Sequence, residues 1–144
     1  MEKRRQNSHF MIFEDDFLIR PSFHKDFFNA FQSLEKSVGN QWDMLYMSCH
    51  FDSYLKRMNL DSNSYDYFLP VKKKILHGLG AVLYKKKCVN VMLNDIYPLK
   101  RQIDHDIPEK FLLTNKLNAY ILLNQKKRPL IHNDNYFYTS TTQN

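Results

Sequence analysis

Three neighbouring carboxylates, Glu14, Asp15 and Asp16, directly follow a short apolar run at residues 9–13. Acidic side chains held this close repel one another, and a bound divalent cation relieves the repulsion. Because residues two apart on a strand point the same way, Glu14 and Asp16 can share one hard cation, or a turn can bring Asp15 and Asp16 together. Oxygen ligands select Mg²⁺ or Mn²⁺ over Zn²⁺. The alternative interpretation is a solvated strand end.

Two later regions also carry side chains capable of chemistry. Asp104 can accept a proton from an attacking hydroxyl or orient an acceptor, and the alternative is a solvated or capping aspartate. Asp106 and Glu109 have the spacing of a capping box, so we interpret Asp106 as a helix cap. His132 lies two residues before Asp134, and one interpretation of it is an ordinary surface histidine.

The elements that must position these side chains alternate between strand and helix. The run at 9–13 predicts a buried strand. Apolar residues at helical spacing predict a helix over 23–38, with Ser22 as its N-cap and Gly39 as its C-terminal cap. Residues 41–48 predict a strand buried on both faces, as in a parallel or mixed central sheet.

The rest of the chain gives shorter signals. No period persists over residues 49–67, which we interpret as largely loop. Pro70 confines an extended stretch at 68–76 to a sheet edge or a strand start. We expect Trp42 and Tyr46 in the core rather than as a platform for a sugar. The remaining expectations are a turn at 77–80, a strand at 81–84, helices at 85–96 and 107–115, and a strand at 117–123.

This alternation predicts one α/β domain over residues 1–144, a mixed sheet flanked by helices, with mobile ends at 1–8 and 135–144. A hydrophobic content of 43% supports a real core. No apolar run is long enough for a transmembrane helix, and Cys49 and Cys88 cannot make a disulfide framework, so we expect a cytoplasmic protein with both cysteines reduced and packed. With three glycines, the chain has no glycine-rich phosphate cradle.

Six short motifs, taken in order, resemble glycosyltransferase family 25. That family includes bacterial lipopolysaccharide glycosyltransferases and the collagen galactosyltransferases. The resemblance covers roughly residues 9 to 140. The motifs are Phe13-Glu-Asp-Asp-Phe-Leu, Trp42-Asp-Met-Leu-Tyr46, Gly80-Ala-Val-Leu-Tyr-Lys-Lys-Lys, Gln102-Ile-Asp104, Ala119-Tyr and Pro129-Leu-Ile-His-Asn-Asp134.

The resemblance implies a partial fold of the GT-A type, which is Rossmann-like, and transfer of a sugar such as galactose from a UDP-sugar to an acceptor hydroxyl on a glycan, lipopolysaccharide or protein. It implies that Asp15 and Asp16 bind the donor, and that Glu14, Asp16 and His132 hold Mn²⁺ or Mg²⁺. It also implies that Asp104 is the catalytic carboxylate. One departure is Gln102, which stands where the family has a proline.

Family members carry a further stretch before the acidic motif, including opening strands that receive the uridine. This chain begins only about a dozen residues before Glu14. We therefore expect a domain that is short at its N-terminal side. Such a domain needs a second copy or a partner chain to supply the missing part, or is inactive alone.

Two other functions stay open. The chain can be a non-catalytic binding or scaffolding module with a degenerate glycosyltransferase fold. It can also be a metal-dependent nucleic-acid-processing protein, because its net charge is +6 and Asp104 and Asp106 add a second acidic pair. The basic residues form separate short runs without interleaved aromatic residues, so nucleic acid is not the partner that we expect.

Overall fold

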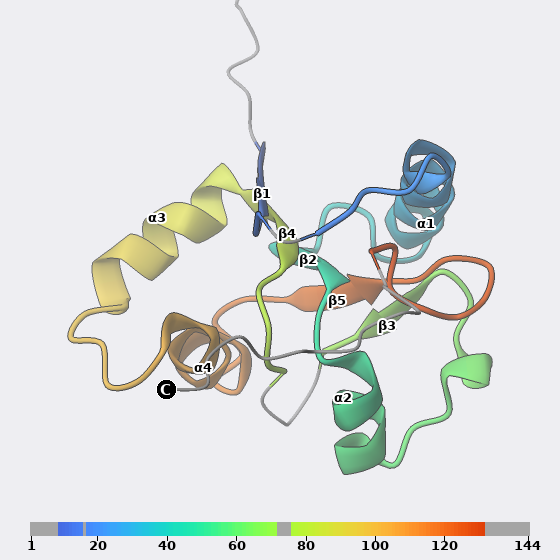
Figure 1. Ribbon diagram of the computed structural model, residues 1–144. Coiled ribbons are helices and arrows are strands. Elements are labelled where there is room, and N and C mark those ends of the chain that lie inside the picture. The colour runs from blue at the N-terminus through green and yellow to red at the C-terminus, as the bar shows by residue number, and fades with distance from the viewer. Residues whose placement is uncertain (1–8, 16, 72–75, 132–144) are drawn as a thin grey trace, which may run out of the picture.

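The computed structural model describes residues 9–15, 17–71 and 76–131 of the chain (Figure 1). The predicted mobile ends therefore lie outside the described residues. In chain order the elements are β1 (His9–Phe13), α1 (Phe23–Val38), β2 (Met44–Ser48), α2 (Phe51–Met58), a short 3-10 helix (Ser62–Ser64), β3 (Phe68–Pro70), β4 (Ala81–Lys85), α3 (Lys86–Asp95), α4 (Ile103–Ile107), which continues as a π-helical segment (Pro108–Leu112), and β5 (Ala119–Leu122).

The strands form one mixed sheet in the order β1-β4-β2-β5-β3. β4 pairs antiparallel with both β1 and β2, β2 pairs parallel with β5, and β3 pairs antiparallel with β5. All five residues of the central strand β2 are buried, which confirms the prediction of a strand covered on both faces. β3 is an edge strand, as Pro70 predicted.

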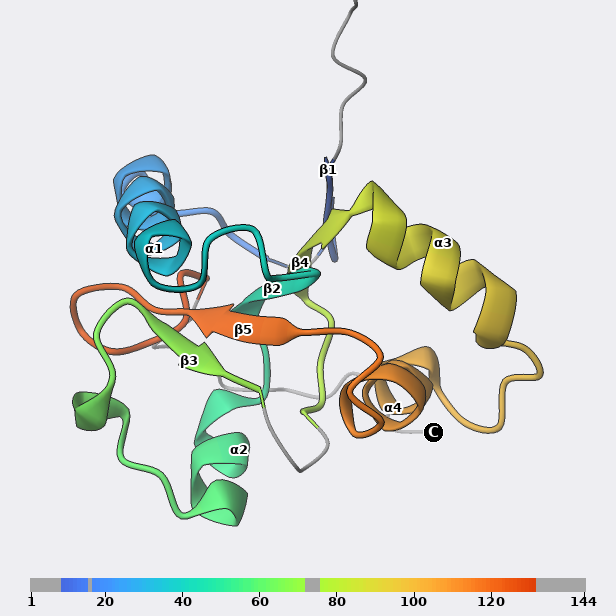
Figure 2. The same cartoon turned by 180° about the vertical axis from the view of Figure 1, so that it is seen from behind.

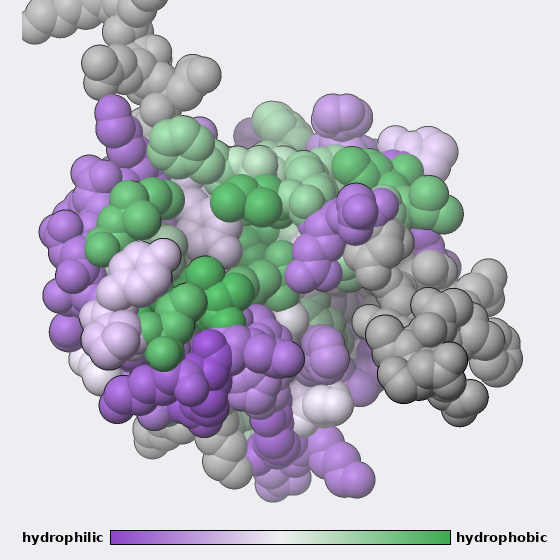
Figure 3. Space-filling model, turned by 60° about the vertical axis from the view of Figure 1, so that its left-hand side comes forward, coloured by the Kyte–Doolittle hydropathy of each residue, from purple (hydrophilic) through white to green (hydrophobic). Residues whose placement is uncertain are grey.

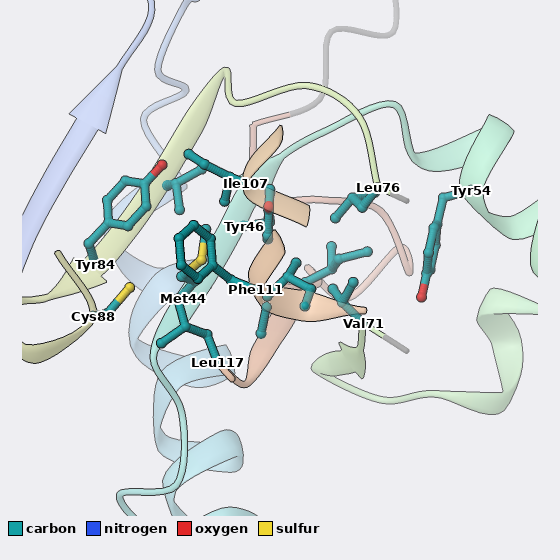
Figure 4. Close-up of a cluster of buried hydrophobic side chains, with 14 of the residues drawn as sticks. Met44, Tyr46, Tyr54, Val71, Leu76, Tyr84, Cys88, Ile107, Phe111 and Leu117 are labelled. Carbon is teal, nitrogen blue, oxygen red and sulfur yellow. The ribbon is translucent and has the colours of Figure 1, made fainter. Parts of the chain in front are cut away.

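Helices cover both faces of this sheet (Figures 1 and 2). Met44 and Tyr46 of β2 face a core that α2, α3 and α4 complete (Figure 4). Leu45 and Met47, which alternate with them, face a second core built with α1 and the segment at 130–131. The α/β fold class is thus confirmed: a mixed sheet flanked by helices, consistent with part of a Rossmann-like arrangement.

Helix α1 matches its predicted bounds. Phe23, Ala30 and Leu34 form its buried face, and Ser22 occupies the N-cap position. Gly39 follows the last turn with φ +59°, a conformation that glycine adopts without the strain of a Cβ. Trp42 and Tyr46 are both fully buried in the two cores, as expected.

Three local predictions are wrong. β1 forms where expected, but every residue of it is exposed because it is the edge strand beside β4. Residues 49–67 contain the unpredicted helix α2, whose eight residues were too few to stand out in a longer window. Helix α4 begins at Ile103, so Asp106 lies within it and is not its cap.

Apolar side chains also gather on the surface between α3 and α4 (Figure 3). They line a groove of about 160 Å³ made by Val89, Met92, Leu93, Ile96, Tyr97, Leu99, Ile103 and Ile107. Among the described helices, none has the length and apolar character needed to cross a lipid bilayer.

Candidate functional site

The predicted acidic segment leaves the sheet beside the segment that leads into β4. Phe13 pairs with Ala81, and the backbone N–H of Glu14 donates a hydrogen bond to the carbonyl of Gly80 at 2.8 Å. Glu14 and Asp15 are both exposed. Two of the predicted metal and donor residues therefore lie at the end of β1 that meets the start of β4, and His77 precedes Gly80 by three residues in the sequence.

Gly80 permits a close approach of this acidic segment. A Cβ at position 80 would lie 2.4 Å from ring atoms of Phe17, and 3.2 Å from Oγ of Ser48. Phe17 therefore packs directly on the Gly80 backbone, and it is part of the core under α1. This contact anchors the chain immediately after the acidic residues. Asp16 and His132 both lie outside the described residues, so their roles remain predictions.

His77 is held at the start of the same segment by the N-terminus of α2. The backbone N–H of His50, the N-cap residue of α2, donates to the carbonyl of His77 at 3.0 Å. The His50 ring covers Gly78, because a Cβ at Gly78 would meet Cδ2 of His50 at 2.7 Å. Gly78 has φ +89°, so both its conformation and its surroundings favour glycine.

Asp104 and His105 lie in the first turn of α4. The side chain of Asp106 joins this turn to the preceding loop by hydrogen bonds. The buried Asp106 carboxylate accepts the backbone N–H of Lys100 at 2.6 Å and that of Arg101 at 3.4 Å. These hydrogen bonds, followed by the positive charges of Lys110 and Arg101, hold the pKa of Asp106 below its usual value. The role of Asp106 is thus to shape the loop that presents Asp104 and His105.

His77, Asp104 and His105 converge on one place. One ligand atom from each lies within 4.8 Å of the others, and all three residues are half-buried. The rings of His77 and His105 are in contact, with centroids 4.1 Å apart and planes at 42°. This is the one group of three or more potential metal ligands found among the described residues. Figures 1 and 2 both place the segment that leads into β4 beside α4.

The electrostatics of the group favour a neutral His77. Burial lowers its pKa, the neighbouring His105 and Arg57 lower it further, and Asp104 opposes them. Its Nδ1 atom is buried and finds no hydrogen-bond partner among the described residues. A neutral imidazole with an unpaired nitrogen is able to ligate a metal or accept a proton.

Tyr46 lies in the core close enough to Asp104 for the two groups to interact electrostatically. It is fully buried, and its hydroxyl has no hydrogen-bond partner among the described residues (Figure 4). Burial raises its pKa, and the charges of Tyr84, Cys49, Cys88 and Asp104 add to the effect. Tyr46 therefore stays protonated and retains a proton for donation.

Sequence reasoning selected Asp104 but missed both histidines of this group. His105 directly follows Asp104, and that adjacency was an available signal. His77 is far from both in the sequence, so no spacing rule connects it to them. The chain matches no family model, no curated protein and no solved structure in comparisons with known proteins.

Proposed function

We propose that this chain is a divalent-metal-dependent glycosyltransferase domain that uses a UDP-sugar, as its resemblance to family 25 implies. One observation supports this most: Asp104, the predicted catalytic carboxylate, is half-buried beside two imidazoles, and one ligand atom from each of His77, Asp104 and His105 lies within 4.8 Å of the others. Glu14, one of the predicted metal residues, separately donates its backbone N–H to the carbonyl of Gly80, in the segment that leads into β4.

The described carboxylates suit the predicted metal. Glu14 and Asp15 are exposed oxygen donors, the class that Mn²⁺ and Mg²⁺ prefer, and Asp16 would complete the set. When bound, such an ion supplies charge neutralisation for a departing diphosphate. Arg57, whose charge acts on His77, adds positive potential on the same side and favours a phosphate-bearing donor.

Asp104 is the proposed base. Its carboxylate is half-buried, and within the described residues it forms no ion pair with a lysine or arginine that would block it. It would accept the proton of the acceptor hydroxyl as that oxygen attacks the sugar. His77 and His105 flank it and would orient the acceptor by hydrogen bonding.

The test uses the purified chain with UDP-hexoses and Mn²⁺. Asp104→Asn keeps the shape of the side chain and should lower transfer or donor hydrolysis by roughly 10²–10⁴-fold, the usual contribution of a general base. Asp95→Asn is the matched control, because Asp95 is an exposed aspartate of α3 paired with Lys116 at 3.4 Å. Equal activity of the two variants would contradict the assignment of Asp104.

Metal binding tests the donor half of the proposal separately. Asp16→Ala should abolish Mn²⁺ binding and Mn²⁺-dependent binding of UDP-hexose. Absence of Mn²⁺ and Mg²⁺ affinity in the intact protein, even at millimolar concentration, would refute the enzyme proposal for this chain.

Exposed apolar surface favours a second candidate, a non-catalytic binding module. Ile12 in β1 is 56% exposed and Leu93 beside the α3–α4 groove is 64% exposed, and such surfaces are typical of interaction sites. Under this alternative, Asp104→Asn and Asp16→Ala should leave the biological phenotype unchanged.

A further inference from the structure

We propose that His77, Asp104 and His105 form a second metal site, which binds a borderline divalent transition metal such as Zn²⁺. The site is separate from the hard-cation site predicted at Glu14, Asp16 and His132. It does not depend on glycosyl transfer, because metal binding is measured without any nucleotide sugar. The two roles of Asp104 exclude each other at any one time: its carboxylate acts as a base only while Zn²⁺ is not bound to it.

The first support is convergence of ligands from distant segments. His77 comes from the segment before β4, whereas Asp104 and His105 come from α4, and the three potential ligand atoms lie within 4.8 Å of one another. In a tetrahedral site with bonds of about 2.0–2.1 Å, ligand atoms lie roughly 3.4 Å apart. A closure of at most about 1.4 Å, within reach of side-chain rotation, would therefore complete the site.

The second support is the state of the ligands. The Nδ1 atom of His77 is buried and has no hydrogen-bond partner among the described residues, so this imidazole has a nitrogen that is still unpaired. Asp104 supplies the negative charge that a bare pair of histidines would lack.

The composition of the set selects the metal. Two imidazole nitrogens and one carboxylate oxygen suit Zn²⁺ and Fe²⁺, whereas Mg²⁺ and Ca²⁺ prefer oxygen ligands alone. Three protein ligands leave a fourth position for water or a substrate atom, which is typical of a catalytic rather than a structural zinc site. Tyr46 and Asp106 lie outside the set: Tyr46 lies in the core near Asp104, and Asp106 holds the loop before it.

Bound metal would also join two parts of the fold. His77 is tied to the start of α2 through His50, and Asp104 to the loop that Asp106 organises. A metal ion bound by both His77 and Asp104 would cross-link α4 to the segment before β4. Binding should therefore raise the Tm of the protein, because a ligand bound by the native state alone stabilises it.

The experiment titrates the full chain, freed of any histidine tag and stripped with a chelator, with Zn²⁺ by calorimetry and with Co²⁺ by visible absorption. We expect one equivalent of Zn²⁺ to bind and to raise the Tm, and Co²⁺ to give the strong absorption of a four- or five-coordinate ion. Mg²⁺ should not compete. Absence of Zn²⁺ binding to the folded wild-type protein at millimolar concentration would overturn the proposal.

Variants assign the ligands. His105→Ala and the isosteric Asp104→Asn should each weaken Zn²⁺ binding by at least about tenfold. His24→Ala is the matched control, because His24 is exposed on α1. Unchanged Zn²⁺ affinity in folded His105→Ala and Asp104→Asn would overturn the site, whatever the wild type binds. Circular dichroism tests whether each variant is folded. If a variant does not fold, Zn²⁺ binding by the wild-type protein remains the test of the proposal.

The two metal proposals fail independently. Asp16→Ala should abolish Mn²⁺ binding and leave Zn²⁺ binding intact, whereas His105→Ala should do the reverse. Loss of both ions in both variants would mean a single shared site and would overturn the separation proposed here. A chain without transferase activity that still binds Zn²⁺ through His105 would refute the proposed function alone.

Discussion

Replacing Gly78 with alanine should destabilise the protein through two separable causes. At φ +89° an L-residue loses roughly 1–2 kcal/mol relative to glycine. The new Cβ would also lie 2.7 Å from Cδ2 of His50, where ordinary contacts fall between 3.4 and 4 Å. Overpacking costs about 1–3 kcal/mol, and we take the lower end, about 1 kcal/mol, because the His50 ring is exposed and can turn away.

The expected total for Gly78→Ala is therefore about 2–3 kcal/mol, or roughly 6–9 °C in Tm for a domain of this size. Chemical denaturation followed by circular dichroism measures the loss. Adding His50→Ala should remove the steric part and restore about 1 kcal/mol, a coupling typical of residues in contact.

Gly39→Ala provides the matched control. Gly39 also has positive φ, at +59°, but a Cβ there would meet nothing within 4 Å. Its cost is conformational alone, so His50→Ala should combine with Gly39→Ala additively, within about 0.5 kcal/mol. If His50→Ala fails to rescue Gly78→Ala, or rescues Gly39→Ala equally, the packing of His50 on Gly78 is refuted.

Two further predictions concern the core and the pH dependence. Phe111→Ala removes a fully buried ring from the core under α4 and should lower the free energy of unfolding by about 3–5 kcal/mol. Leu113→Ala is the control, because Leu113 is 37% exposed, and it should cost less than about 1 kcal/mol. Denaturant titration measures both losses, and similar values would contradict the placement of Phe111. His77 has a pKa below 6.5 in the folded protein, so as the pH falls below 6.5 the unfolded chain takes up a proton first and stability declines until the folded-state pKa is passed. His77→Asn should flatten this decline in pH-dependent melting curves, and an unchanged slope would show that His77 does not carry it.

Local amphipathic patterns predicted the parts of the fold whose burial follows from their own sequence. Phe23 and Leu34 recur on one face of α1, and the continuous apolar run in β2 is typical of a central strand. α2 carried the same kind of pattern in Phe51, Tyr54 and Met58, but over only eight residues, and a longer window averaged it away.

Features set by distant parts of the chain were not predictable in this way. The run at 9–13 resembles a buried strand, and only the strand order shows that it lies at an edge. Asp106 matched a capping pattern, yet its carboxylate binds N–H groups upstream of it, because α4 begins earlier than the pattern indicated. Likewise, His77 meets Asp104 only through tertiary structure, so the candidate site was predicted in part.

The position of β5 has a consequence for how the molecule is made. β5 is the last strand among the residues that the structure describes, yet it lies between β2 and β3 and provides the pairing partner that joins them. During synthesis, β3 cannot form its pairing with β5 until residues 119–122 have left the ribosome. Pairings between such distant segments form slowly, so the nascent chain should stay vulnerable to aggregation until β5 has been synthesised.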